Sequence, residues 1–288
     1  MEEYISFDSH KRYTLAEREE VATGRAVQRR IEHRPGAIRE YLRDCPARTA
    51  VAVEATGNWY WIVDEIEQAG LVQRLVHPRK AKLMMGMINK TDKLDVHGFN
   101  RLQRNKTLPT VWIPPGRLRD LRELTRTRMV LTRQRTQLKN RLSATLAKYG
   151  LVVGEWSDPF GVAARREMGE VIERLPEQTR WVSGLLLARM DGLAEPINQI
   201  EQRLKQLLEP TEESQLLQSL PGIGPILSAV MALEIGPADR FASGERLASY
   251  SGTTPRVKSS GGKTSYGRLR PDAMRNGVQH PCSFCPDD

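Results

Sequence analysis

The chain has 288 residues, enough for two or three domains of ordinary size, each able to bury a core. Its 44 Lys and Arg outnumber 35 Asp and Glu, and the formal net charge of +9 favours a polyanionic partner, with nucleic acid the default candidate. Three cysteines exclude a disulfide framework and indicate a reducing compartment. The chain start lacks a secretory signal pattern, and the longest apolar stretch, around residues 226–233, is too short to span a bilayer. We therefore expect a cytoplasmic protein with no membrane contact.

Residues 1–112 carry the pattern of a mixed α/β domain. Strands are predicted at residues 4–8, 12–19, 24–32, 49–54 and 71–76. A short helix follows the break at residues 34–36, and a longer helix is predicted at residues 57–69. This order of elements indicates a mixed sheet of the ribonuclease H, or RuvC-like, type. The fold class is therefore predicted as α/β at the start of the chain and mainly α after it.

Four carboxylates in this region share a place at the edge of a predicted element: Asp8, Glu54, Asp92 and Asp95. The first two close predicted strands, and the last two lie three residues apart at a helix start. A carboxylate at the end of a half-buried strand costs desolvation free energy, which a bound cation offsets. We therefore predict a divalent-metal site of the kind that cuts phosphodiesters. Taken alone, Asp92 could equally be part of a helix N-terminus and Asp95 a surface charge.

Residues 113–116 form the clearest boundary, and a long helix is predicted from there to Tyr149. Leucines at heptad spacing predict a helical, coiled-coil segment over residues 116–210, whose second arm at 193–207 packs antiparallel on the first or dimerises. Ten basic and two acidic residues lie between Arg117 and Lys148, a pattern that suits phosphate backbones or a solvated helix face. The candidate DNA or RNA contacts on this helix are Arg126, Arg133, Lys139 and Arg141. Trp156 and Trp181 are interpreted as packing anchors.

Residues 214–275 are predicted as a third domain, which opens with a glycine-containing turn before an apolar helix. Gly222 and Gly224 in this turn would expose backbone N–H groups to phosphate, as in helix-hairpin-helix units, although an ordinary helix connection would use glycine as well. Further along, Ser260 lies beside two glycines in a predicted electropositive loop. The basic residues around it are Arg256, Lys258, Lys263 and Arg268.

Five segments in this order resemble the transposases of insertion-sequence family 110, the DEDD transposases related to the Piv invertase. The segments are Phe7-Asp8-Ser9-His10-Lys11, Val53-Glu54-Ala55-Thr56-Gly57, Lys90-Thr91-Asp92-Lys93-Leu94-Asp95, Leu220-Pro221-Gly222-Ile223-Gly224 and Ser259-Ser260-Gly261-Gly262-Lys263. The resemblance covers residues 4 to about 275, and the ordered set is more specific than any one motif.

The resemblance implies a RuvC-like domain, a coiled-coil insertion and a C-terminal transposase domain with a nucleophilic serine. It implies that Asp8, Glu54, Asp92 and Asp95 bind Mg²⁺ and that Ser260 is the nucleophile, with Ser259 as its competitor. His10 and His97 flank the acids and are expected to be structural, because oxygen ligands suit Mg²⁺ better than imidazole. DNA, a bridge RNA in some members, and further copies of the chain are the implied partners.

The resemblance fails after residue 275, where residues 276–288 show no amphipathic period. We interpret them as an aberrant tail that could leave the serine loop without support. Two alternatives to a serine recombinase therefore stay open. One is a metal-dependent nuclease that uses the acids and water, and the other is an inactive protein that only binds nucleic acid.

Overall fold

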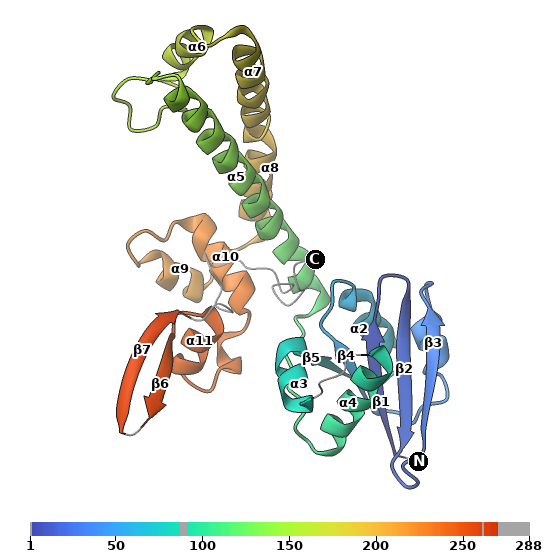
Figure 1. Ribbon diagram of the computed structural model, residues 1–288. Helices are drawn as coiled ribbons and strands as arrows, with labels where there is room; N and C mark the ends of the chain where they lie inside the picture. The colour runs from blue at the N-terminus through green and yellow to red at the C-terminus, as the bar shows by residue number, and fades with distance from the viewer. Residues whose placement is uncertain (1, 87–90, 261, 270–288) are drawn as a thin grey trace. The chain divides into compact units, whose positions relative to one another are not determined.

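In the computed structural model, the described residues are 2–86, 91–260 and 262–269. They divide into two compact units, residues 2–114 and residues 115–269, drawn in Figure 1. Every helix within these ranges is too short or too polar to cross a membrane. The predicted tail at residues 276–288 lies outside the described residues.

The first unit is built on a five-stranded sheet with the strand order β3-β2-β1-β4-β5. Its strands are β1 (Glu3–Ser9), β2 (Tyr13–Glu20), β3 (Ala26–Glu32), β4 (Ala50–Glu54) and β5 (Val72–Val76). The first three strands pair antiparallel, whereas β4 pairs parallel with β1 and with β5. The mixed sheet confirms the α/β prediction and is consistent with a RuvC-like fold.

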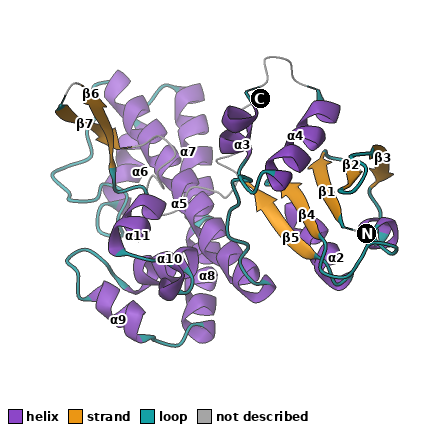
Figure 2. Cartoon of the chain, turned by 90° about the horizontal axis from the view of Figure 1, so that it is seen from below, coloured by secondary structure: helices purple, strands orange, loops and turns teal. Residues whose placement is uncertain are grey.

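Helices cover both faces of this sheet (Figure 2). They are α1 (Ala37–Tyr41), α2 (Trp59–Gln68), α3 (Pro78–Met85) and α4 (Asp92–Arg104). Alternation along the strands separates two cores: Phe7 and Val53 pack with Ile62 of α2 on one face, while Ala52 packs with Phe99 of α4 on the other. The sheet therefore holds α4, with its two predicted acids, against the strands that end in Asp8 and Glu54.

The contact of α4 with β1 and β2 is unusually polar for a buried interface. The Ser6 hydroxyl donates to the Val96 carbonyl at 2.7 Å, and the Gln103 amide donates to the Ile5 carbonyl at 2.8 Å. On β2, Glu17 is 1% exposed and Glu19 is 2% exposed. Because buried polar groups need partners with defined geometry, these contacts fix the register of α4 on the sheet more closely than apolar packing would.

The second unit is mainly helical. Its elements are α5 (Gly116–Lys148), α6 (Arg165–Glu173), α7 (Glu177–Asp191), α8 (Ala194–Leu207), α9 (Glu212–Gln218), α10 (Pro225–Ile235), the 3₁₀ helix η1 (Ala238–Arg240), α11 (Gly244–Ser251), β6 (Pro255–Ser260) and β7 (Lys263–Leu269). Both α7 and α8 pack back along the long helix α5 (Figure 1). The returning arm thus begins at Glu177, earlier than the predicted residue 193, because α7 carries little amphipathic signal in its sequence.

One face of α7 leaves apolar side chains exposed. Trp181 is 64% exposed, Leu185 is 53% exposed and Val182 is 44% exposed. Leu185 lies four residues after Trp181 and three after Val182, so its side chain is next to both on the helix surface. The interpretation of Trp181 as a packing anchor is therefore wrong within this chain. Trp156 is 43% exposed, and its ring N–H donates to Glu167 at 2.6 Å.

The start of α5 is fastened to the end of α10 by buried arginines. The Arg126 guanidinium donates to both oxygens of Glu234, at 2.9 and 3.0 Å. Arg122 donates to the carbonyls of Leu233 and Glu234, at 2.8 and 2.9 Å. Arg122, Arg126 and Glu234 are all less than 7% exposed. Cations at a helix C-terminus also interact favourably with the helix dipole, so this cluster defines where α10 lies on α5.

We predict that Arg126→Ala lowers the free energy of unfolding of the second unit by about 3 kcal/mol, because it leaves a buried carboxylate without its main partner. Urea unfolding followed by circular dichroism measures the change. Arg133→Ala, at an exposed position of the same helix, is the matched control and should change stability by less than about 0.5 kcal/mol. Equal effects of the two substitutions would contradict a structural role for the buried pair.

Candidate nucleic-acid-processing site

The acidic site lies where two parallel strands of the first unit end. The pairing of β1 with β4 runs through Ser6 opposite Ala52 and Phe7 opposite Val53. One residue further along the same register, Asp8 is beside Glu54, with their backbones about 5 Å apart. Asp8 is 5% exposed and Glu54 is half-buried. The parallel register thus brings the two predicted strand-end acids to one edge.

Helix α4 supplies a third carboxylate to this edge. Asp92 is the first residue of the helix, after the cap Thr91, whose hydroxyl accepts from the Leu94 N–H at 3.3 Å. His10 Nε2 lies 3.3 Å from an Asp8 oxygen and 3.0 Å from an Asp92 oxygen. Ligand atoms of Asp8, His10 and Asp92 all lie within 4.8 Å of one another. Loop, strand and helix therefore converge on one point.

The chemistry of this group suits a divalent cation. His10 Nε2 is buried and makes no hydrogen bond, although two carboxylate oxygens lie close to it. Carboxylates brought this close repel one another unless a positive charge lies between them. Oxygen ligands from Asp8 and Asp92 fit Mg²⁺, which binds few protein carboxylates and keeps water as further ligands. The carboxylate oxygens of Asp8 and Asp92 therefore suit a hard divalent cation such as Mg²⁺.

Glu54 and Asp95 are adjacent to this group but outside the 4.8 Å set. Asp95 lies one turn into α4, half-buried, on the side of the helix that carries Asp92. Of the four predicted acids, the structure thus brings Asp8 and Asp92 to one point. Glu54 ends β4, the strand that pairs with β1, and Asp95 lies on α4 together with Asp92.

Tyr13 is a site residue that the sequence did not reveal. Its hydroxyl donates to Asp92 at 3.3 Å, and its ring lies 4.6 Å from the His10 ring. Desolvation and then the Asp92 charge raise the Tyr13 pKa, so the phenol keeps its proton and can donate. The Arg30 guanidinium lies 3.8 Å from the centroid of the same ring. His10 follows β1 and Tyr13 begins β2, and this closeness in the sequence was the one signal available for Tyr13.

The predicted serine loop is a β-hairpin of the second unit. Ser260 ends β6 and pairs with Lys263, the first residue of β7, so that only two residues form the turn. Gly262 has φ of 75°, which a two-residue hairpin turn requires. The Ser260 side chain is exposed, whereas the Ser259 hydroxyl lies 3.3 Å from the Thr264 hydroxyl. Ser260 thus lies at the tip of a strand pair.

The basic residues around the serine belong to the same two strands. Arg256 and Lys258 lie in β6, and Lys263 and Arg268 lie in β7. Lys263 is exposed. The hairpin therefore places four cationic residues within one short ribbon of backbone.

The glycine turn joins two helices, α9 and α10. Helix α9 is followed by the turn at residues 219–224 and then by α10, and the Ser228 hydroxyl donates to the Ser214 carbonyl at 2.9 Å to join the two helices. Gly222 has φ of 85°, a value that residues with a side chain rarely adopt. Gly224 caps α10 without a side-chain hydrogen bond. The first N–H groups of α10 therefore suit an anion such as a backbone phosphate.

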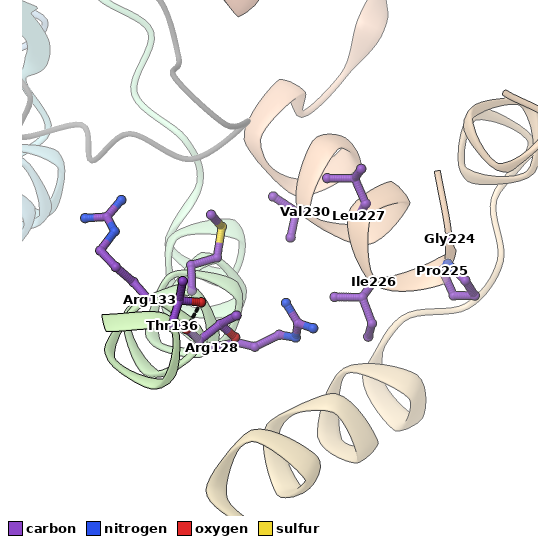
Figure 3. A pocket seen from close by; sticks show the side chains of 10 residues that line it. Arg128, Arg133, Thr136, Gly224, Pro225, Ile226, Leu227 and Val230 are labelled. Carbon is purple, nitrogen blue, oxygen red and sulfur yellow. Dashed lines mark hydrogen bonds between the residues drawn. The ribbon is translucent and has the colours of Figure 1, made fainter. Parts of the chain in front are cut away.

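A pocket of about 520 Å³ lies between this helix start and α5 (Figure 3). Gly224, Pro225 and Ile226 line one wall, and Arg128 and Arg133 come from α5. Arg128 extends toward Ile226 in Figure 3 while its guanidinium donates to Glu201 at 2.7 Å. Arg133 is exposed, so its guanidinium can contact a ligand that enters this pocket from solvent, whereas Arg128 is paired with Glu201.

The other predicted cations of α5 differ in their surroundings. Arg126 is buried against Glu234, so its selection as a nucleic-acid contact was mistaken: its charge is used within the fold. Lys139 lies 3.1 Å from Asp158 and 5.4 Å from the Phe160 ring centroid, and its hydrogen bond to Asp158 lowers the pKa of that carboxyl. Arg141 is exposed, like Arg133. The sequence pattern of basic residues could not separate the buried from the exposed ones.

Together, an acid group able to hold a metal and a long helix α5 rich in arginine and lysine indicate a protein that processes nucleic acid. Comparison with known proteins agrees. Residues 8–150 match a family of DEDD transposases of IS110 elements, and residues 214–276 match the transposase IS116/IS110/IS902 family. The chain belongs to the IS110 family of transposases, which are DNA-binding enzymes.

Individual relatives carry the same description. The chain is 26% identical to a transposase for insertion sequence element IS1328 of Yersinia enterocolitica, over 79% of this chain and 67% of the relative. It is 26% identical to a probable family 20 transposase of Pseudomonas aeruginosa, over 81% and 68%. It is 24% identical to a transposase for IS1111A of Coxiella burnetii, over 74% and 58%. The chain thus spans about two thirds, or less, of the length of these relatives.

We predict that the first unit's acid group binds Mg²⁺ or Mn²⁺ and that Asp8→Asn weakens this binding at least about tenfold, because it removes a buried charged ligand. Isothermal titration calorimetry of the full chain measures it. Asp44→Asn, an exposed carboxylate of the same unit, is the control and should leave the affinity unchanged. An unchanged affinity in Asp8→Asn would exclude Asp8 as a ligand.

Proposed function

We propose that the chain is an insertion-sequence transposase that cuts and rejoins DNA through a covalent serine intermediate. The observation that carries the proposal is the convergence of Asp8 and Asp92 on His10 within 4.8 Å, in a chain that also presents an exposed serine on a basic hairpin. The predicted metal ligands are Asp8, Glu54, Asp92 and Asp95. Bound there, Mg²⁺ would offset the charge of the phosphate and of a deprotonated oxygen.

The chain's own residues have separate tasks in this proposal. Asp8 and Glu54 fix their oxygens through strand backbone, and α4 fixes those of Asp92 and Asp95. Tyr13 keeps its proton and holds one Asp92 oxygen in place. His10 lies against both Asp8 and Asp92, so it can carry a proton next to the acids or yield its place to the cation. Rigid elements, rather than loops, thus position most of the acid group.

Ser260 is proposed as the nucleophile. Its Oγ forms a bond to phosphorus while the bond from phosphorus to the leaving 3′-oxygen breaks, and the serine proton leaves as the 3′-hydroxyl is formed. The reverse of the same exchange with another 3′-hydroxyl rejoins the strand without an external energy source. Lys263, Arg256 and Arg268 are proposed to stabilise the charge on phosphorus oxygens during the exchange. Ser260 lies at the end of β6, whereas the Ser259 hydroxyl lies beside that of Thr264, and this supports the choice of Ser260 over Ser259.

Nucleic-acid binding is proposed for the hairpin, for the glycine turn and for exposed cations of α5. The proposed contacts are Gly222, Gly224, Arg133, Lys139, Arg141 and Lys258. The uncapped start of α10 beside Arg133 supports phosphate contact there. A structured guide RNA is proposed as a second polyanion on the strength of the family resemblance and of the net charge of +9.

We predict that denaturing gels show a slow-migrating protein–DNA band when the protein is incubated with Mg²⁺, element-end DNA and the RNA transcribed beside its gene. Ser260→Ala should abolish the band, because no other hydroxyl forms the phosphoester. Ser259→Ala is the matched control and should retain it. Cut DNA ends without any band would instead support a nuclease that uses water, and binding without cutting would support an inactive binding protein.

Self-association through the helical arm is a further part of the proposal, with α5, α7 and α8 as the predicted coiled-coil segment. The exposed apolar residues Trp181, Val182 and Leu185 on α7 support it, because contiguous apolar surface favours association. We predict that the double substitution Trp181→Ser and Leu185→Ser shifts the protein to a smaller species in size-exclusion chromatography with light scattering. Val162→Ser, at a 97% exposed loop valine, should not. An unchanged mass in the double variant would place the interface elsewhere.

A further inference from the structure

We propose that the first unit has a second cation site, formed by Glu17 and Glu19 of β2 and His97 of α4, which takes a divalent transition-metal ion such as Mn²⁺. This site is distinct from the acid group proposed to act in DNA cutting. One ligand atom from each of the three residues lies within 4.8 Å of the other two. It goes beyond the proposed function, because it needs neither Asp8 nor Ser260.

The three side chains meet between the sheet and α4. Glu17 and Glu19 are two residues apart on β2 and so share the face that α4 covers. His97 Nδ1 lies 3.2 Å from a Glu17 oxygen. Ligands about 2.1 Å from a shared ion lie about 3 to 4 Å from one another, so small rotations of these side chains suffice to enclose one.

One carboxylate oxygen of Glu19 lacks a partner among the surrounding protein groups that the structure describes. Glu19 is 2% exposed, and its Oε1 accepts from Arg104 at 2.7 Å. Its Oε2 is buried and has no hydrogen-bond partner within the part of the chain that the structure describes. A buried carboxylate oxygen without a partner costs several kcal/mol, and such groups are rare in folded proteins. A cation beside Oε2 removes this cost.

The surroundings fix the carboxylates in the orientation that ligands need. The Gln28 amide donates to Glu17 Oε2 at 2.7 Å, and the Asn100 amide donates to Glu17 Oε1 at 3.1 Å. Such second contacts orient metal-ligating carboxylates in known sites. Arg104 supplies one positive charge, but its side chain is 47% exposed and it meets Glu19 from one side only. Two buried carboxylates thus face one guanidinium and one imidazole.

The donor set indicates the class of ion. Two carboxylates and one imidazole match Mn²⁺ or Zn²⁺, whereas an imidazole is a poor ligand for Mg²⁺ or Ca²⁺. Water has access from the side of His97, whose side chain is 48% exposed, and can complete the coordination. His97 was expected to be a structural residue, and in this proposal it stabilises the structure by binding the ion.

The position of the site gives it a role. His97 follows Asp92 and Asp95 on α4, and β2 pairs with β1, the strand that ends in Asp8. An ion held by both elements ties α4 to the sheet next to the proposed acid group. His97, Glu17 and Glu19 are thus positioning residues, which act on the acids by fixing the helix that carries two of them.

The test is a Mn²⁺ titration of the full chain in which Asp8→Asn and Asp92→Asn have already disabled the acid group. Calorimetry should show one Mn²⁺ per chain in this background. Adding Glu19→Gln should weaken binding at least about tenfold, since it neutralises a buried ligand. Mn²⁺ is chosen because thiolates bind it weakly, which keeps the cysteines out of the measurement.

Glu20→Gln is the matched control, because Glu20 lies on the same strand with its side chain on the opposite face. It should leave Mn²⁺ affinity unchanged. His97→Ala, at a half-exposed position, is the second variant in case Glu19→Gln does not fold, and it should also weaken binding and remove any Mn²⁺-dependent rise in the thermal midpoint. Absence of Mn²⁺ binding in the background variant, or binding unaffected by both substitutions, overturns the proposal.

Discussion

The parallel pairing of β1 with β4 is the constraint on which the acid site depends. Parallel strands end on the same side of a sheet, so Asp8 and Glu54, about 45 residues apart in sequence, become neighbours through backbone register alone. A slip of one residue would turn both side chains to the opposite, apolar face. The cores on the two faces, around Phe7 on one and Phe99 on the other, make that slip costly. Packing far from the acids thus determines their geometry.

Much of the first unit could be predicted from sequence, because its strands alternate and its acids stand at element ends. His10 and Tyr13 illustrate what could not. Their roles arise from contacts with Asp92, which lies some 80 residues further along, and no local pattern encodes such a contact. In the second unit, the segment around Ser260 was expected as a loop, since serine, glycine and lysine are poor strand signals, yet β6 and β7 pair there.

Arginine accounts for the largest error of interpretation. Along α5 the sequence shows a nearly unbroken basic series, which is typical of phosphate binding. Arg119, Arg122 and Arg126 are nevertheless buried, and the last two bind the C-terminus of α10 and the Glu234 carboxylate. A single acid more than 100 residues away, Glu234, thus neutralises part of this basic series inside the fold. Composition measures how much charge a helix carries, whereas tertiary contacts decide how much of it faces a partner.

The hairpin that carries Ser260 has a consequence for when the serine can react. Within the described residues β6 and β7 form a sheet of only two strands, and an isolated two-stranded ribbon is marginally stable in water. Its conformational entropy falls only when another surface covers it. If that surface is the nucleic acid, ordering of the ribbon and capture of the strand become one thermodynamic event. In the proposed reaction, the hydroxyl would then be held rigidly only while a substrate is present, which would protect other DNA from attack.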